Sequence, residues 1–189
     1  MVAPEPDDDY LVRRAQDGYV DAYEELVRRH AAMAYRVALR LLDDHHDAED
    51  VAQEALTTGW QRLAGFRGQS SFSTWMYRIV TRTALNRMRS GHPADSLDLL
   101  AAADHPVDPV AIDPARTAER RATSGALTEA IGALPPAQRI VVVLHHLEGL
   151  SYEEVARIVG STEPAVRGHL YRARRTLAVV LSSWGGERS

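Results

Sequence analysis

Apolar side chains recur every three or four positions along most of this chain, which is the spacing of the buried face of an α-helix. In the first part the series is Leu11, Ala15, Ala22, Leu26, Met33, Val37 and Leu41. Gly18 and the pair Asp43–Asp44 interrupt it, and we expect a third helix from about Asp47 to Leu63. Glycines and serines at Gly65–Ser71 predict a loop, after which a fourth helix runs to about Arg89. Residues 8–90 are therefore expected to form a bundle of helices.

The helical spacing stops between residues 91 and 123, where four prolines and six acids replace it. Such a segment is typical of a solvated linker, and helix is expected to resume from about Ala115. Helical spacing is clear again over residues 124–184. The predicted fold is all-α, with two small helical domains joined by a flexible acidic linker. The first is an N-terminal helical bundle over residues 8–90, and the second is a C-terminal helix-turn-helix domain over residues 124–184.

Local signals place the helix ends of the second domain. Pro135–Pro136 opens a helix that Gly149 closes, so the apolar run Ile140–Leu144 is helical rather than a strand. Ser151 and Glu154 form a capping box at the start of the next helix. A turn at Gly160–Thr162 follows, and Pro164 stands in the first turn of the last helix. Two helices joined by a tight turn that contains glycine predict a helix-turn-helix.

The last helix has one apolar face and one basic face. The apolar stripe is Val166, Leu170, Ala173, Leu177 and Leu181, and the opposite face presents Gly168, Tyr171, Arg172 and Arg175, flanked by Arg167. From Pro164 to Ala178 there are four arginines and no acid. Such a helix suits the major groove of DNA, where arginine binds phosphates or guanine edges. The alternative is a helical hairpin whose basic face is only solvated.

The sign of the charge changes along the first domain. Residues 1–54 hold fourteen acids against six arginines, a net charge of −8, whereas residues 55–92 hold six arginines and no acid. The basic block also carries Trp60, Phe66, Phe72, Trp75 and Tyr77. Arginines mixed with aromatics suit single-stranded nucleic acid, because phosphates need positive charge and unpaired bases need flat surfaces. The acidic block suits a basic protein partner.

Two stripes in this domain are candidate binding faces. One holds Trp75, Arg78, Arg82, Asn86 and Arg89, within about 80° of one another on a helix, and it favours DNA. The alternative is that Trp75 belongs to the core and the arginines are solvated. The other stripe holds Asp50, Gln53, Glu54 and Thr57. It is either an ordinary solvent face or a docking face for a basic partner.

Other classes of function are disfavoured. The chain has no cysteine, and its first ten residues lack the basic flank and apolar core of a signal peptide. Its longest apolar run is too short to span a bilayer. The cluster Asp43-Asp44-His45-His46-Asp47 lacks an ordered ligand spacing, so we expect no metal site, and His145–His146 is interpreted as packing or surface. No catalytic motif is present, and we expect neither catalysis nor a cofactor.

Four motifs carry a resemblance to a known family. They are DAEDVAQEAL, then W-x-R-L-x-x-F-R-G-x-S-S-F-x-T-W-M-Y-R-I, then ALPPAQR, then LSYEEVARIVGSTEPAVRGHLYRAR. In this order the chain resembles a bacterial RNA polymerase sigma factor of the extracytoplasmic-function group, in the sigma-70 family. The resemblance extends from about Asp8 to Leu181. It implies a cytoplasmic promoter-specificity subunit that inserts into no membrane and directs the polymerase core to promoters.

The resemblance also implies roles for particular residues. The face with Asp50, Gln53, Glu54 and Thr57 would bind the clamp helices of the largest polymerase subunit, and the second domain would meet the flap of the second-largest subunit. Melting and recognition of the −10 element would fall to Phe66, Arg67, Ser71, Trp75, Arg78, Arg82 and Asn86, with one base flipped into a pocket at the loop. The −35 element would be read by Arg167, Gly168, His169, Tyr171, Arg172 and Arg175. The linker would follow the path of the exiting RNA, and an anti-sigma factor is a further partner that the family allows.

This chain departs from the family pattern at three positions. Arg82 stands where many members have asparagine, and Gly168 and His169 stand where many have serine and arginine. The promoter sequence therefore does not carry over. The sequence leaves two alternative functions open: a helix-turn-helix repressor with an effector-sensing first domain, and a metal-dependent enzyme centred on Asp43–Asp50.

Overall fold

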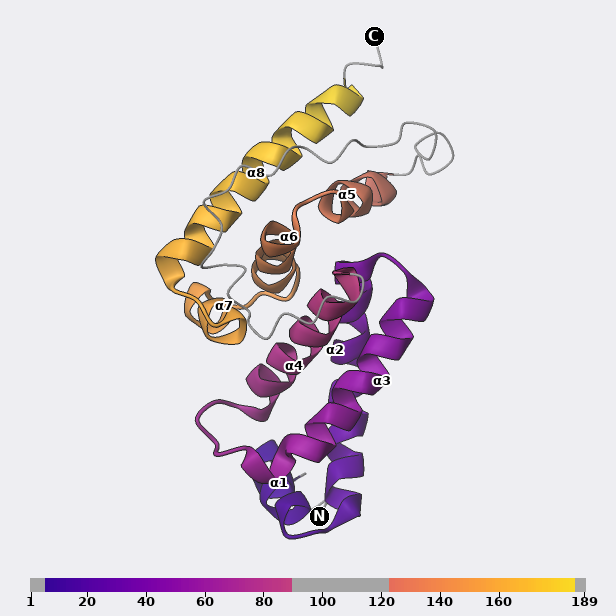
Figure 1. Ribbon diagram of the computed structural model, residues 1–189, viewed down its shortest axis with the longest axis vertical. Helices are drawn as coiled ribbons and strands as arrows, with labels where there is room; N and C mark the ends of the chain where they lie inside the picture. Colours follow the sequence, from indigo (N-terminus) through magenta and orange to yellow (C-terminus); the bar gives the residue numbers. More distant parts are fainter. Residues whose placement is uncertain (1–5, 90–122, 186–189) are drawn as a thin grey trace, which may run out of the picture.

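The computed structural model describes residues 6–89 and 123–185, and every regular element in these two ranges is helical. The N-terminal bundle holds α1 (Asp8–Gln16), α2 (Val20–Leu42), α3 (His45–Arg62), the 3₁₀ turn η1 (Leu63–Gly65) and α4 (Phe72–Met88). The C-terminal domain holds α5 (Thr123–Gly132), α6 (Pro136–Val142), the π-helical turn η4 (Val143–Leu147), α7 (Tyr152–Val159) and α8 (Glu163–Gly185). The all-α prediction is confirmed (Figure 1). The predicted linker, apart from Thr123, lies outside the described residues.

The acid pair after α2 ends one helix and starts the next. Asp43 adopts a left-handed conformation with φ 55°, and its N–H donates to the Leu39 carbonyl at 2.9 Å. Asp44 then caps α3, because its Oδ1 accepts from the Asp47 N–H at 2.9 Å. This hydrogen bond lowers the pKa of the Asp44 carboxyl. Since the cap is Asp44, α3 begins at His45, two residues before the position expected from the sequence.

The core of the bundle lies between α2, α3 and α4. Small buried residues on α3, among them Ala48, Ala55 and Gly59, allow α2 to approach closely. At the far end, α1 is tied to α2 through Asp8, which accepts hydrogen bonds from Arg29 at 3.2 Å and from His30 at 2.7 Å. The close packing of α3 on α2 fixes the helix that carries the acidic stripe, and the Asp8 contacts fix α1 on the same bundle.

The C-terminal domain follows the expected helix signals, with one addition. Pro135 caps α6 and Pro136 is its first residue, as predicted. The helix then widens into a π turn, in which the Glu148 N–H donates to the Val143 carbonyl five residues back, at 3.0 Å. Gly149, with φ 75°, ends this segment. The π turn takes more residues than an α turn, so it changes the direction in which Glu148 points.

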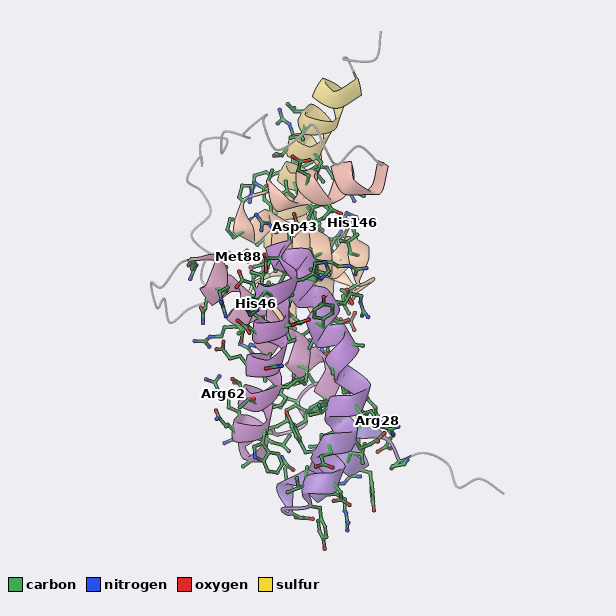
Figure 2. The ribbon with its side chains drawn as sticks, turned by 90° about the vertical axis from the view of Figure 1, so that its right-hand side faces the viewer. Arg28, Asp43, His46, Arg62, Met88 and His146 are labelled. Carbon is green, nitrogen blue, oxygen red and sulfur yellow. The ribbon has the colours of Figure 1, made fainter. Side chains whose placement is uncertain are left out.

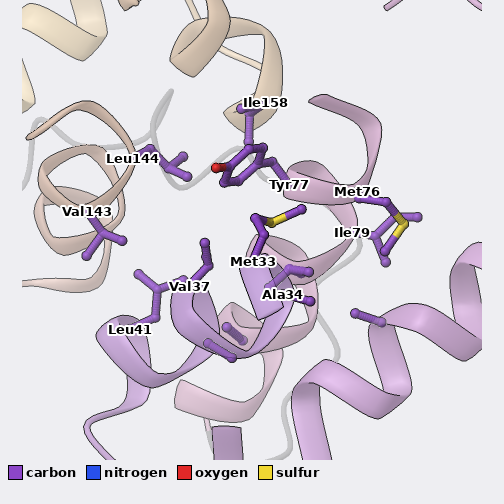
Figure 3. Close-up of a cluster of buried hydrophobic side chains, with 14 of the residues drawn as sticks. Met33, Ala34, Val37, Leu41, Met76, Tyr77, Ile79, Val143, Leu144 and Ile158 are labelled. Atoms are coloured by element: carbon purple, nitrogen blue, oxygen red, sulfur yellow. The ribbon is translucent and has the colours of Figure 1, made fainter. Parts of the chain in front are cut away.

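The two domains pack against each other along α2 and α4. Met33, Val37 and Leu41 of α2 lie with Val143 and Leu144 in one buried cluster (Figure 3), and Tyr77 of α4 and Ile158 of α7 complete it. The end of the bundle that carries Asp43 and Met88 faces the C-terminal domain (Figure 2).

A guanidinium adds a polar contact at this end. Arg139 of α6 donates to the Leu41 carbonyl at 2.7 Å, one of the orphan carbonyls at the end of α2, and also to Gly132 and Leu134. Burial lowers the pKa of the Arg139 guanidinium.

Candidate nucleic-acid and partner interfaces

The loop after η1 is held in place by α1. Gln16 donates from its amide nitrogen to the carbonyls of Leu63 and Phe66, at 2.9 and 2.8 Å. Ser71 caps α4, because its Oγ accepts from the Thr74 N–H at 3.1 Å. Both ends of the loop are therefore anchored through hydrogen bonds, which positions the exposed Arg67 between them.

An aromatic cluster connects this loop to α4. The rings of Phe66 and Trp75 lie 5.0 Å apart between centroids, and Phe72 lies 5.6 Å from Trp75. Phe72 is buried, whereas Phe66 and Trp75 are half-buried. Trp75 thus contributes to the packing of the aromatic cluster and also borders a cavity. It is neither a fully buried core residue nor a fully exposed one.

A cavity of about 330 Å³ opens between the loop and α4. Among its lining residues are Phe66, Arg67, Trp75 and Arg78, four of the seven residues predicted for the −10 site. Ser71, Arg82 and Asn86 do not line it, and Asn86 is exposed further along α4. Its remaining wall includes Arg157 and Ile158 from α7 of the other domain. Arginines, aromatics and polar groups around one hollow suit a nucleotide base and its phosphates.

The acidic stripe of α3 faces solvent. Gln53, Glu54 and Thr57 are exposed, and Asp50 is half-buried beside Arg87 of α4, with Asp50 Oδ2 and Arg87 Nη2 3.5 Å apart. Arg87 also donates to Asp47 at 2.9 Å, so it links α3 to α4. The sequence offered no signal for this arginine, because the link depends on how the two helices pack.

The helix-turn-helix forms through the predicted cap and turn. Ser151 Oγ accepts from the Glu154 N–H at 3.2 Å, and Glu154 accepts from the Ser151 N–H at 2.8 Å, which completes the capping box. That backbone hydrogen bond lowers the pKa of Glu154. Gly160, with φ 68°, ends α7, and the Ser161 N–H donates to the Ala156 carbonyl at 2.9 Å.

The basic face of α8 is open to solvent. Tyr171 exposes 63% of its surface, and Arg167, Arg172 and Arg175 are also exposed. Arg167 lies over the ring of Tyr152, 4.3 Å from its centroid, which orients its guanidinium. These four side chains are therefore accessible from solvent.

Two predicted members of the −35 set differ from this picture. His169 is only 2% exposed, because it lies on the same face as Val166 and Leu170, toward the core. It is therefore not presented to DNA, contrary to the prediction. Gly168 is half-buried, and a Cβ at that position would lie 3.7 Å from Nη1 of Arg172.

The acids and histidines around the start of α3 serve local structure. Asp44 caps the helix, His45 Nδ1 lies 2.7 Å from the Tyr35 hydroxyl, and Asp47 pairs with Arg87. In the part of the chain that the structure describes, no group of three or more such side chains is arranged to hold a metal ion. Within the same residues, no helix is long and apolar enough to cross a membrane.

An exposed basic helix in one domain and a cavity lined by arginines and aromatics in the other define a helical DNA-binding protein. Comparison with known protein families agrees with this class and identifies the family within it. Sigma-70 region 2 matches residues 26–92, and sigma-70 region 4 matches residues 124–177.

Relatives match over nearly the whole chain. The RNA polymerase sigma-H factor of Pseudomonas aeruginosa is 34% identical over 182 residues, which is 92% of this chain and 93% of that protein. The ECF RNA polymerase sigma-E factor of Escherichia coli K12 is 34% identical over 176 residues, 90% of this chain and 92% of that protein. Among solved structures, CnrH in complex with the cytosolic domain of CnrY is similar, with a TM-score of 0.69 and 25% identity, over 93% of this chain and 97% of that one.

The chain belongs to the extracytoplasmic-function group of the sigma-70 family. It is a sigma factor that directs RNA polymerase to promoters through regions 2 and 4, and as a transcription initiation factor it is not an enzyme.

Proposed function

We propose that the open face of α3 is where the polymerase core docks. Asp50, Gln53, Glu54 and Thr57 would meet the clamp helices of the largest subunit, and the C-terminal domain would meet the flap of the second-largest subunit. The support is exposure together with charge. Three of the four side chains are exposed, and the acids suit a basic surface.

The cavity beside α4 is proposed as the place where the −10 element is opened. Arg67 and Arg78 would bind phosphates of the non-template strand, and a base turned out of the stack would enter the cavity beside Phe66 and Trp75. A volume of about 330 Å³ is ample for one base. Arg82 and Asn86 would continue the strand's path along α4, and Ser71 would contribute by fixing the start of that helix.

The basic face of α8 is proposed to read the −35 element in the major groove. Arg167, Tyr171, Arg172 and Arg175 are the residues that would contact DNA. The half-buried Gly168 would allow close approach of the backbone, and His169 would support α8 from the core side. The main support for the proposal is that the chain contains both regions. Region 2 carries the cavity beside α4, and region 4 carries the exposed basic face of α8.

The place of action follows from these partners. Polymerase and promoter DNA are in the cytoplasm, and we propose that this chain works there. CnrH was solved with the cytosolic domain of CnrY. By analogy, we propose an anti-sigma factor as a further partner of this chain.

Run-off transcription from a library of random promoters tests the function. Purified polymerase core is assayed with and without the chain, and the transcripts are sequenced. Transcripts that require the chain and share two upstream elements would support both proposed DNA sites. If none requires the chain, while the chain alone binds duplex DNA tightly, a helix-turn-helix repressor explains the protein better.

A further inference from the structure

Gln16, the last residue of α1, holds the loop of the proposed −10 site from outside that site. Its amide nitrogen donates to the Leu63 carbonyl at 2.9 Å and to the Phe66 carbonyl at 2.8 Å. A carbonyl oxygen accepts hydrogen bonds and cannot donate them, so the side chain must turn its NH2 group, and not its oxygen, toward the loop. The two carbonyls match the two N–H bonds of that group.

The two carbonyls are those of the first residue of η1 and of the residue that follows η1. Leu63 is buried, so the core sets its position, and its carbonyl also accepts from the Phe66 N–H at 3.0 Å. Gln16 therefore ties the exit of the turn, at Phe66, to a fixed point at its start. This bond sets the direction in which the Phe66 ring and Arg67 leave the turn, and both side chains line the cavity.

The loop has little apolar burial of its own to keep it in one shape. Between Leu63 and Phe72, only Phe66 and Ser70 are half-buried, and the other residues are exposed. Gly68 adopts a left-handed conformation with φ 67°, and glycine loses more conformational entropy on ordering than any other residue. The order of such a segment depends on hydrogen bonds, and Gln16 supplies two of them from a neighbouring helix.

The opposite end of α1 supports the aromatic cluster as well. Asp8 Oδ2 lies 2.7 Å from Nε2 of His30, and the His30 ring lies 5.1 Å from the ring of Phe72 between centroids. Helix α1 also has a buried face of its own on the bundle. Gln16 itself is exposed, so its replacement should leave α1 and the bundle folded and act on the loop alone.

We infer that Gln16 is a positioning residue for base recognition in the −10 element, because it holds the loop in the shape that receives the flipped base. Gln16 does not itself line the cavity, and the inference rests on the proposed function of that cavity. A loop that is already ordered loses less conformational entropy when the base binds. The attraction of arginines for phosphates varies slowly with distance and tolerates a displaced loop, whereas a base must fit its cavity.

Binding of single-stranded DNA to the holoenzyme tests this role. The full-length chain is assembled with polymerase core, and fluorescence anisotropy measures its affinity for a labelled strand that carries the −10 sequence selected in the run-off assay. Each nucleotide is then replaced in turn by an abasic one, and the replacement that costs the parent most affinity marks the flipped base. The test variants are Gln16→Ala, which removes both donors, and Gln16→Glu, which keeps the shape. The control is Gln61→Ala, which removes the same amide from an exposed position on α3.

The quantity to compare is the ratio of the affinities for the intact and the abasic strand, since a change in charge affects both strands alike. Gln16→Ala should lower this ratio about fivefold, the scale of one net hydrogen bond, while Gln61→Ala leaves it unchanged. Gln16→Glu should lower it at least as far, because a carboxylate oxygen would then face two carbonyl oxygens. An unchanged ratio in both Gln16 variants, even if both strands bind more weakly, would overturn the inference.

The parent's own response to the abasic strands separates this inference from the function on which it rests. If no abasic nucleotide costs the parent affinity, the cavity receives no base, and its proposed function fails together with the role of Gln16. If one position does cost affinity, but the Gln16 variants keep the parent's ratio, only the positioning role is refuted and the proposed −10 cavity stands. Circular dichroism checks that each variant is folded.

Discussion

Gly59 gives the sharpest test of how the bundle is packed. It lies inside α3, where replacing glycine by alanine ordinarily stabilises a protein by about 1 kcal/mol. Here an added Cβ would lie 2.7 Å from the Tyr23 hydroxyl oxygen and 3.1 Å from Sδ of Met76. Met76 is flexible and can move. Tyr23 is fixed, because its hydroxyl donates to the Leu56 carbonyl at 2.6 Å and its ring packs on Trp60.

We therefore expect Gly59→Ala to destabilise the protein. Overpacking costs about 1–3 kcal/mol, and displacement of the Tyr23 hydroxyl loses a hydrogen bond of about 1 kcal/mol. The helix gain of about 1 kcal/mol offsets part of this. The net loss in the free energy of unfolding should be about 1–3 kcal/mol. Burial raises the pKa of Tyr23 to about 12, so its hydroxyl stays protonated and can donate to the Leu56 carbonyl.

Urea unfolding followed by tryptophan fluorescence measures this loss. The control is Gly65→Ala, since a Cβ at Gly65 meets no atom within 4 Å. In a Tyr23→Phe background the clash is relieved, so Gly59→Ala should then be neutral or stabilising, and the double-mutant cycle isolates the contact. A stabilisation of about 1 kcal/mol by Gly59→Ala in the parent would refute the reasoning.

Three further predictions concern the surfaces. Changing Asp50 and Glu54 together to Arg should abolish binding to polymerase core. The free energy of unfolding should change by under about 1 kcal/mol, because the Asp50–Arg87 pair is partly exposed. Unchanged core affinity would remove this face from the proposal. Arg172→Ala should weaken binding to the −35 element by about 1–3 kcal/mol, and so reduce transcription from −35-dependent promoters, without reducing core binding. Equal loss of transcription and core binding would contradict its role. Ser151→Ala removes the half of the capping box in which the Ser151 hydroxyl accepts from the Glu154 N–H, and it should cost about 1 kcal/mol in thermal unfolding experiments.

The elements that the sequence predicted are those with local causes. The capping box at Ser151, the proline start of α6 and the break at Asp43–Asp44 each depend on residues within one turn of one another. Their geometry follows from short-range hydrogen bonds and from backbone preferences, so a single chain without relatives is enough to locate them. The exposed arginines of α8 were predictable for the same reason, because the apolar stripe defines the opposite face.

What the sequence did not show depends on packing between distant segments. The bond from Arg36 to Glu148 joins residues 112 positions apart, and no periodicity marks it. The π turn that aims Glu148 has no signature in propensities. His169 is a different case: its spacing from Val166 and Leu170 placed it on the buried face, but the prediction followed its place in the family motif. For such a residue the helical wheel is the better guide.

The buried carboxylate of Glu148 and the two arginines of α2 that pair with it should respond unequally to truncation. Glu148→Ala leaves Arg36 and Arg40, whose side chains are already 46% and 33% exposed and regain water easily, so the contact between the two domains loses about 1.5–3 kcal/mol of charged hydrogen bonds. Arg36→Ala with Arg40→Ala leaves a carboxylate 2% exposed without a cation, which costs about 3–5 kcal/mol. In urea unfolding, the double arginine variant should therefore lose more of the free energy of unfolding than Glu148→Ala. Equal losses would mean that the apolar contacts, and not the buried charge, dominate the packing of the two domains.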